Sequence, residues 1–403
     1  MPDAVIVATG RTPIGRAVKG SLADVRPDDL AAHLVRRVLE QVPQLDGAEI
    51  EDLILGCGMP AGESGWNMAR VVAILAGLDG VPGTTVNRYC SSSLQTIRMA
   101  AHAIRAGEGD VFVAAGVETV SRFGNGTSDL LEAANPLFAD AMARTLARAA
   151  ASGEPWESSD GLPDVYISMG QTAENVAELE GVSRAEMDEF ALRSHQLAVA
   201  SQDSGFFDRE IVPVVKHDGT LVDRDDGPRS DTSIEKLAAL RPAFREGGTV
   251  TAGNSCPLND GAAAVVVMSD TRARELGIAP LARIVASAVS ALNPEIMGLG
   301  PVEATRKALA RAQLTIDDID LVEINEAFAA QVIPSARKLD IPWSKLNVRG
   351  GAIALGHPYG MTGARIMTTL LNALEDEGKR FGLETMCVGG GQGMAMIVER
   401  LGT

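Results

Sequence analysis

Short apolar runs that alternate with longer amphipathic stretches are the feature that most constrains the fold of this chain. Strands are expected at residues 4–8, 52–55, 111–115, 263–268, 281–287, 321–324 and 385–388. Several of these runs are apolar throughout, as strands covered on both faces are. Helices with apolar residues three and four apart are expected at residues 27–41, 91–106, 184–201, 302–312 and 363–376. This alternation favours an α/β fold over an all-α or all-β fold.

Composition narrows the class of protein. A length of 403 residues suggests two or three domains. A hydrophobic content of 46% and a charged content of 22% exclude disorder as the main state. The formal net charge of −17 argues against a nucleic-acid partner, because phosphates need a basic surface. The longest apolar stretches, such as 262–268, are far shorter than the roughly 20 residues of a membrane-spanning helix, so no membrane partner is expected.

The cysteines and the first residues bear on the compartment. Cys57, Cys90, Cys256 and Cys387 lie far apart without a CxxC pair, so neither a disulfide framework nor a metal site is expected. The apolar run at residues 4–8 has no basic region before it and is expected to form the first strand, not a signal peptide. We therefore expect a cytoplasmic protein.

The middle of the chain differs from its flanks. Residues 122–250 hold short apolar pieces, charged helices and turns rich in Pro, Gly and Asp, without long buried strands. We interpret this segment as an insertion over a core made from the flanking parts. The flanks also resemble each other, because a helix after Cys90 and a helix after His357 each lead to a buried strand. That similarity suggests a duplicated unit.

Cys90 is the first candidate for chemistry. It follows a short strand-like run and stands where a helix is expected to begin. Helix N-terminal amides and the macrodipole favour a thiolate and should lower the thiol pKa, which would activate a nucleophile. A buried structural cysteine is the more frequent role of a lone intracellular cysteine, so both interpretations stay open at this point.

His357 is the second candidate, and it stands in an unusually constrained loop. Small or turn-forming residues surround it, namely Gly350, Gly351, Gly356, Pro358, Gly360, Thr362 and Gly363. Such a loop presents the imidazole rigidly, and an ordinary pKa near 6.5 suits a general base. The alternative is a loop histidine that only caps the next helix.

Two further motifs end expected strands. Cys387 is followed by three glycines, Gly389, Gly390 and Gly391, whose amides could surround a reacting carbonyl as an oxyanion hole. Neither a phosphate-binding P-loop nor a GxGxxG fingerprint fits this run, although close strand-to-helix packing could explain part of it. Asn325, at the end of the strand over 321–324, can donate its amide to a carbonyl oxygen or a water.

Together and in this order, these motifs resemble the thiolase family. The resemblance begins at residues 5–15, continues through 240–244 and 251–263, and ends around Cys387. It implies an α/β fold of two similar halves packed as a duplicated αβαβα sandwich with an inserted loop domain. The expected division is an N-terminal half at 1–121 plus 251–269, a loop domain over the coenzyme A site at 122–250, and a C-terminal half at 270–403.

The resemblance also implies roles for the four candidates. Cys90 would carry the acyl group as a thioester, and His357 would be the base that activates it. Cys387 would be the acid and base for the substrate carbon. One oxyanion hole would use His357 with Asn325 through an ordered water, and the second would use the amides of Cys90 and Gly389. Two holes suit a reaction in which charge develops at two places.

Coenzyme A (CoA) is implied as a substrate, with no permanently bound cofactor. The residues expected to bind CoA or the acyl substrate are Met169, Arg229, Phe244, Ser255, Cys256, Leu258, Met297, Ala327 and Phe328. Cys256 stands where short-chain biosynthetic thiolases have Ser, and Ser168 stands where His is frequent. Both departures favour degradative thiolysis of a larger 3-ketoacyl-CoA, in fatty-acid or sterol side-chain degradation. Residues 288–301 and 356–366 look most similar to actinobacterial steroid side-chain thiolases.

Other interpretations remain. A biosynthetic acetyl-CoA C-acetyltransferase, which forms acetoacetyl-CoA, is the alternative within the family. A decarboxylating ketoacyl synthase would lack the Cys387 loop, and a non-catalytic acyl-CoA or sterol binder would have little reason to keep the full set of four side chains. A homodimer or homotetramer is expected, since the strands near 83–86 and 111–117 are rich in Gly and Ala and offer a pairable edge.

Overall fold

A computed structural model describes residues 2–150 and 156–401 of the chain. Its main sheet has two parts that meet where Val5 and Ile6 pair with Arg283 and Ala282. One part contains, in order, β4 (Gly83–Val86), β3 (Asp52–Gly56), β5 (Val111–Thr119), β8 (Asn259–Ser269) and β1 (Ala4–Arg11). The other contains β9 (Ala282–Ala291), β12 (Gln392–Arg400), β11 (Phe381–Val388) and β10 (Leu321–Ile324). The fold is therefore mixed α/β, as predicted.

The two parts share one topology, which confirms the predicted duplication. In the first, β4, β3 and β5 are parallel, and β8 and β1 follow antiparallel. In the second, β10 and β11 are parallel, β12 and β9 are antiparallel, and a parallel bridge from Val322 to Leu346 takes the place of β4. Cys90 follows β4, and His357 follows the bridge at Leu346, so the two lie at corresponding points of the repeat.

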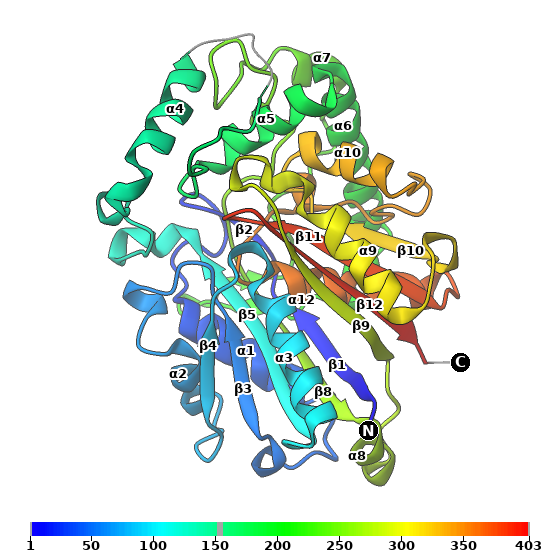
Figure 1. Cartoon of the computed structure of the whole chain (residues 1–403). Helices are drawn as coiled ribbons and strands as arrows, with labels where there is room; N and C mark the ends of the chain where they lie inside the picture. Colours follow the sequence, from blue (N-terminus) through cyan, green and yellow to red (C-terminus); the bar gives the residue numbers. More distant parts are fainter. Residues whose placement is uncertain (1, 151–155, 402–403) are drawn as a thin grey trace.

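Three hydrophobic cores explain why the strands are apolar on both faces. The central core holds α3 (Ser92–Ala106) and α12 (Thr362–Asp376) between the inner faces of the two sheet parts. A second core packs α1 (Pro27–Leu39) and α2 (Met68–Leu75) on the outer face of the first part. A third packs α9 (Gly300–Ala312) and α10 (Ala329–Lys338) on the outer face of the second part. These are the five layers of an αβαβα sandwich (Figure 1).

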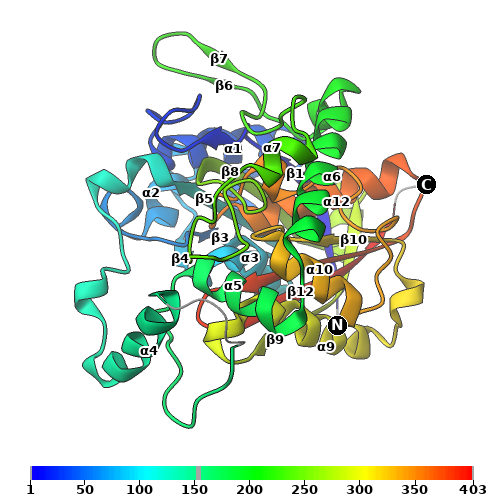
Figure 2. The same ribbon diagram turned by 90° about the horizontal axis from the view of Figure 1, so that it is seen from above.

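Residues 122–150 and 156–250 lie mainly over one end of the sandwich (Figures 1 and 2). They form α4 (Ala139–Ala150), α5 (Met169–Glu180), α6 (Arg184–Asp203), α7 (Ile234–Ala238) and the short hairpin β6 (Val214–Val215) and β7 (Leu221–Val222). Side chains of α5 and α6 enter the third core. We keep the division into two halves and an inserted loop domain as a proposal.

Some elements differ from the sequence-based expectation. The prediction that 111–117 offers an exposed edge is wrong, because β5 is paired on both sides, with β3 and β8, and every residue in it is buried. Only β4 is an edge strand of that part, since it pairs with β3 alone. The pattern also missed β12, α2, α5 and α10, as well as α8 (Asp270–Leu276) and α11 (Ala352–Leu355). No helix in the described ranges is long and apolar enough to cross a membrane.

Candidate active site

Cys90 and His357 come from corresponding elements of the two halves, and Asn325 and Cys387 come from two neighbouring strands of the second half. Cys90 lies in a single helical turn, Tyr89–Ser91, that leads directly into α3. His357 lies in the loop before α12, the partner of α3 in the central layer. Asn325 directly follows β10, and Cys387 is the penultimate residue of the neighbouring strand β11. The carboxyl ends of parallel strands meet at one edge of a sheet, which is where sites in α/β folds form.

Cys90 is a buried thiol whose sulfur faces two amides. Only 7% of the residue is exposed. Burial raises the pKa of the Cys90 thiol to about 11, and the amides of Gly389 and of Cys90 itself, which donate toward the sulfur, oppose that rise. The amides lower this pKa as predicted, but the loss of water on burial raises it more, so the net shift is upward. The two amides do lie together, as an oxyanion hole formed by Cys90 and Gly389 requires.

The hydrogen bonds of His357 fix its tautomer. Thr362 Oγ1 donates its single hydrogen to the Pro358 carbonyl oxygen, at 2.8 Å. It must then accept from His357 Nδ1, at 2.6 Å, so the ring proton is on Nδ1 and the Nε2 lone pair accepts from Asn325 Nδ2. Burial, with a smaller effect of the Arg365 charge, lowers the pKa of His357 to about 3. The resting imidazole is therefore neutral, with Nε2 available as a base.

Asn325 contacts the Nε2 side of that imidazole ring. Its Nδ2 lies 3.3 Å from His357 Nε2. Its backbone is fixed at both ends, because its amide donates to Thr385 O and its carbonyl accepts from Gln331 Nε2. Asn325 Oδ1 is buried without a hydrogen-bond partner among the described residues. A buried polar atom of this kind is a place for an ordered water, which fits the predicted water-mediated oxyanion hole.

Cys387 and Cys256 complete a group of three thiols. Cys387 is fully buried, and burial raises its pKa well above the ordinary value, with further contributions from Cys90 and Cys256. Burial likewise raises the pKa of Cys256, and Cys90 adds to the rise. The amide of Cys256 donates to Ala327 O, which connects this thiol to the segment that follows Asn325. All three cysteines are therefore protonated, neutral thiols at rest.

A pocket of about 450 Å³ opens beside Cys90. Its walls are mainly apolar and include Met59, Tyr89, Leu130, Leu131, Val165, Tyr166, Ile167, Met169 and Tyr359. Gly389 and Gly390 also line it, so the proposed oxyanion amides face the same space as the thiol. The Tyr359 ring packs edge-on against His357, with ring centroids 5.2 Å apart. Tyr359 therefore links the base to the pocket of the nucleophile.

A second pocket, of about 520 Å³, contains Arg229 and Leu258. Arg16 and Arg229 give it a cationic lining, and Leu237 and Leu240 add apolar surface. Lys236 also lines it and is paired with Asp231 of the same lining at 2.7 Å. The amide of Arg229 donates to His195 Nδ1 at 3.3 Å. A pocket with cations at one wall and apolar side chains at another suits a phosphate-bearing ligand with an apolar arm, as predicted for CoA.

The remaining predicted binding residues form a cluster at the start of α10. Phe244 and Phe328 pack edge-on with centroids 5.9 Å apart, and Ser255 bridges to Phe328. Ser255 Oγ is committed to Thr251 O at 2.7 Å. Met297 is 1% exposed and lies in the third core. The ligand contacts of these residues stay predictions.

The sequence did not single out three residues that support the site. Thr362 fixes the His357 tautomer, Tyr359 packs on the imidazole, and Glu118 accepts amides from two loops that face the site. Glu118 had one signal, since it is a carboxylate that follows a run of seven non-polar residues in the same strand.

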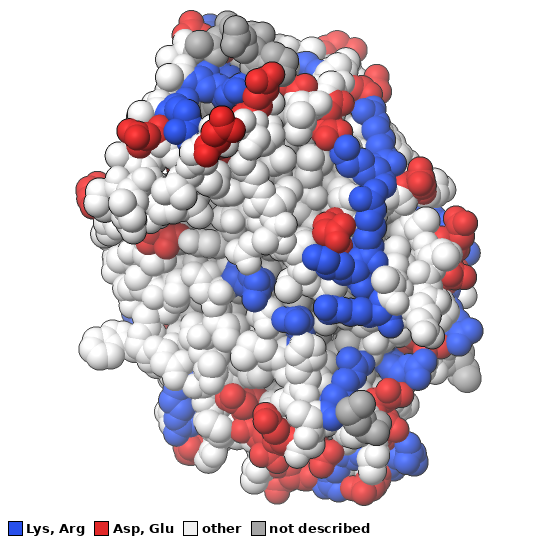
Figure 3. Space-filling view, viewed as in Figure 1, with Lys and Arg blue, Asp and Glu red and all other residues white. Residues whose placement is uncertain are grey.

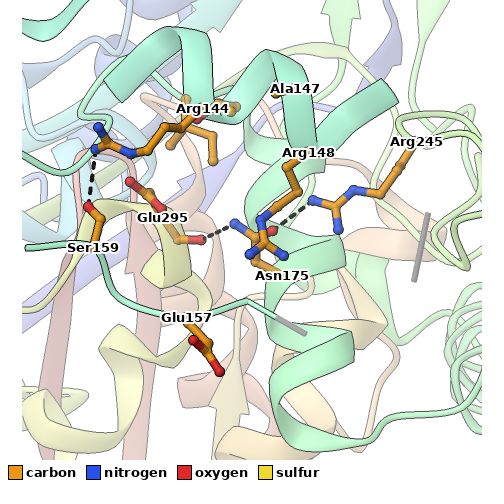
Figure 4. A pocket seen from close by; sticks show the side chains of 10 residues that line it. Arg144, Ala147, Arg148, Glu157, Ser159, Asn175, Arg245 and Glu295 are labelled. Atoms are coloured by element: carbon orange, nitrogen blue, oxygen red, sulfur yellow. Dashed lines mark hydrogen bonds between the residues drawn. The ribbon is translucent and has the colours of Figure 1, made fainter. Parts of the chain in front are cut away.

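A third pocket, between α4 and α5, contains none of the predicted site residues (Figure 4). Its arginines are engaged within the protein, Arg144 with Ser159 Oγ and Leu162 O, and Arg245 with Glu178 and Asn175. Within the described ranges, no group of three or more His, Cys, Asp or Glu side chains is placed to hold a metal ion.

Comparisons with known proteins agree with this geometry. A family model described as the N-terminal domain of thiolase matches residues 4–271, and one for the C-terminal domain matches 278–400. The chain is 45% identical to a 3-ketoacyl-CoA thiolase of Saccharophagus degradans, over 99% of this chain and 98% of that protein. It is also 45% identical to a 3-ketoacyl-CoA thiolase of Bacillus subtilis, over 99% of this chain and all of that protein.

A solved structure of similar shape is the Bacillus anthracis acetyl-CoA acetyltransferase. It has a TM-score of 0.87 and 40% identity, and the match covers 100% of this chain and 99% of that one. The narrower resemblance to actinobacterial steroid side-chain thiolases stays a prediction.

Proposed function

The chain belongs to the thiolase family, and on that premise we propose that it is a degradative 3-ketoacyl-CoA thiolase. It would cleave a 3-ketoacyl-CoA with free CoA, giving acetyl-CoA and an acyl-CoA two carbons shorter. The observation that carries the proposal is the Cys90 thiol at an apolar pocket of about 450 Å³. That pocket offers room for an acyl tail longer than the methyl group of acetoacetyl-CoA. CoA is a substrate here, and the reaction needs no permanently bound cofactor.

In the first half-reaction, Cys90 Sγ attacks the C3 carbonyl carbon while His357 Nε2 takes the thiol proton. The C3 oxygen becomes an oxyanion, which the amides of Cys90 and Gly389 would stabilise. Protonation converts His357 Nε2 into a donor, so with the Asn325 water it can bind the thioester oxygen of the leaving enolate. The C2–C3 bond then breaks, and Cys387 Sγ protonates C2 to release acetyl-CoA.

In the second half-reaction, CoA is the nucleophile. The Cys387 thiolate takes the proton from the CoA thiol, which restores the Cys387 thiol. The CoA sulfur attacks the Cys90 thioester, and the departing Cys90 sulfur regains its proton from His357. Two neutral thiols and a neutral imidazole are therefore both the starting and the final state, consistent with the pKa directions at Cys90, His357 and Cys387.

CoA binding would use the cationic pocket. We propose that Arg229, helped by Arg16 and Lys236, binds the phosphates, while Leu258 and the Phe244–Phe328 pair flank the pantetheine arm. The proposed set of CoA- and substrate-binding residues is completed by Ser255, Ala327, Cys256, Met169 and Met297.

We further propose that the protein is a cytoplasmic homo-oligomer. β4 is an edge strand, and a second copy could pair along it by displacing the Asn67 side chain, which bonds the Gly83 carbonyl at 2.8 Å and the Thr85 amide at 3.0 Å. The chemistry needs Cys90 and Cys387 as thiols, which a reducing compartment preserves.

Thiolysis tests the proposal directly. Purified protein, free CoA and a long or bulky 3-ketoacyl-CoA should release acetyl-CoA steadily, and the release should require CoA. Cleavage of acetoacetyl-CoA alone would favour the short-chain, biosynthetic alternative, and no reaction with either substrate would contradict the proposal and favour the non-catalytic binder. Cys90→Ala should lose the covalent acyl adduct detected by mass spectrometry. Cys387→Ala should still form that adduct from a simple acyl-CoA but should lose carbon–carbon cleavage, and cleavage near the wild-type rate would contradict its role.

A further inference from the structure

Glu118 is a fully buried carboxylate that the mechanism above does not use. It stands near the end of β5, in the first half of the chain, and none of its surface is exposed. No arginine, lysine or histidine forms an ion pair with it within the described ranges. A buried carboxylate without a cation is costly, so its hydrogen bonds must account for its presence.

Those hydrogen bonds come from two different loops. Glu118 Oε2 accepts the amides of Gly58, at 2.7 Å, and Gly360, at 2.9 Å. Glu118 Oε1 accepts the amide of Met59 at 3.1 Å, and the Cys57 thiol lies 3.7 Å away. Residues 57–59 follow β3 in the first half, whereas Gly360 belongs to the His357 loop of the second half. One oxygen therefore joins the two halves of the chain.

The backbone around this contact has no spare room. A Cβ on Gly360 would lie 2.3 Å from the Val117 carbonyl oxygen, and one on Gly116 would lie 2.0 Å from the Gly360 oxygen. A Cβ on Gly58 would lie 2.8 Å from Glu118 Oε2. The His357 loop is thus seated directly on the ends of β3 and β5, at a distance that only glycines permit.

From this arrangement we propose that Glu118 is a positioning residue that sets His357 at the correct distance from Cys90. The nucleophile belongs to the first half and the base to the second, so their separation depends on contacts between the halves. Glu118 reaches across and holds Gly360, three residues from the imidazole. The inference rests on the proposed thiolase function. It also agrees with the opposing effects on the Glu118 pKa, which burial raises to about 7 and the three amides hold down.

Substitutions can separate position from charge. Glu118→Gln keeps the side-chain length, and its carbonyl oxygen can still accept both Gly58 and Gly360, whereas its NH2 group replaces the oxygen that accepts the Met59 amide. Glu118→Asp keeps the negative charge, but its side chain is one methylene group shorter, which moves the carboxylate away from the Gly58 and Gly360 amides. A positioning role therefore predicts that Gln retains more activity than Asp. A misplacement near 1 Å can cost about 100-fold in rate, so we expect kcat about 100-fold lower in Glu118→Asp and Glu118→Ala, and within about fivefold of wild type in Glu118→Gln.

The readouts are thiolysis and alkylation of Cys90 by iodoacetamide. The fall in Glu118→Asp should appear in kcat, with KM for CoA unchanged, and the alkylation rate constant at pH 8 should fall with it. Glu174 is a matched control, because it is also buried and accepts the Thr249 and Val250 amides. Glu174→Gln should lower the melting temperature at most and leave kcat within about threefold.

Each result decides the matter. Activity of Glu118→Asp equal to or above that of Glu118→Gln would overturn the proposal in favour of a charge or proton-transfer role. A Glu118→Ala variant with near wild-type kcat would also overturn it, and if that variant does not fold, the order of Gln and Asp still decides. Alkylation needs no acyl substrate, so it tests the positioning even if the wild-type protein proves not to be a thiolase.

Discussion

At the scale of single residues, the site works with neutral groups. With a pKa of about 11 for the Cys90 thiol and about 3 for the His357 imidazole, both groups are neutral at rest and do not form a thiolate–imidazolium pair. The thiolate fraction of Cys90 should therefore rise about tenfold for each pH unit up to its pKa. We predict that the rate of Cys90 alkylation, measured by mass spectrometry, increases steadily from pH 6 to pH 10. A plateau near pH 7 would show a preformed ion pair instead.

Buried carboxylates behind the site give a second residue-scale prediction. Burial raises the pKa of Glu323 to about 8, while the Arg365 charge opposes the rise. The folded chain then binds more protons than the unfolded chain above the ordinary value near 4.5. This contribution to stability is present below pH 4.5 and is lost as the pH rises through 8. Glu323→Gln should show a smaller fall in melting temperature between pH 6 and 9 than the wild type, and an equal fall would contradict the prediction.

At the scale of elements, the packing of α12 matters most for the stability of the fold, because this helix lies in the central layer between both sheet parts. Leu370 of α12 is fully buried in the central core. Leu370→Ala should lower the free energy of unfolding by about 2–5 kcal/mol, as large-to-small core substitutions do, measured by urea denaturation. Leu146→Ala, at a side chain that is 71% exposed on α4, is the control and should change it by less than about 0.5 kcal/mol. Equal effects at the two positions would contradict the layer assignment.

The same scale shows what the sequence could predict and why. The continuous apolar run at 263–268, inside β8, stands out because strands covered on both faces are mostly apolar. Both bounds of β10 were also predicted, although Glu323 interrupts its apolar run. β12 was missed because it begins inside a glycine-rich run, where backbone freedom hides the pattern. α5 was missed because polar residues on it, such as Gln171 and Glu174, are buried against Phe244, Thr249 and Val250, so no apolar stripe appears.

The candidate site divides in a similar way. Cys90, His357, Asn325 and Cys387 were predictable because nucleophile, base and donor need particular side chains in particular turns. Glu118 and the sign of the Cys90 pKa were not, because both depend on contacts between halves far apart in the chain. Local sequence carries the first kind of information, and only the folded packing carries the second.

At the scale of the whole molecule, charge is unevenly distributed. The formal net charge is −17, yet Figure 3 shows a band of Lys and Arg on one face, over the side where α9 and α10 lie. The proposed CoA pocket, with Arg16, Arg229 and Lys236, is a second concentration of cations. An anionic ligand is thus attracted by the cations of the pocket and repelled by the net negative charge of the whole protein. Salt weakens both effects.

This opposition gives the last prediction. Charge-assisted hydrogen bonds are worth about 1.5–3 kcal/mol, so Arg229→Ala should raise KM for CoA by about tenfold or more while leaving kcat at saturation near the wild-type value. The wild-type KM should also rise with salt, and the slope should be smaller in Arg229→Ala because one attractive charge is gone. Lys307→Ala is the control, since Lys307 pairs with Glu303 on the surface of α9 and should affect neither quantity. If Arg229→Ala lowers kcat with KM unchanged, the pocket does not bind CoA phosphates and Arg229 acts on the chemistry instead.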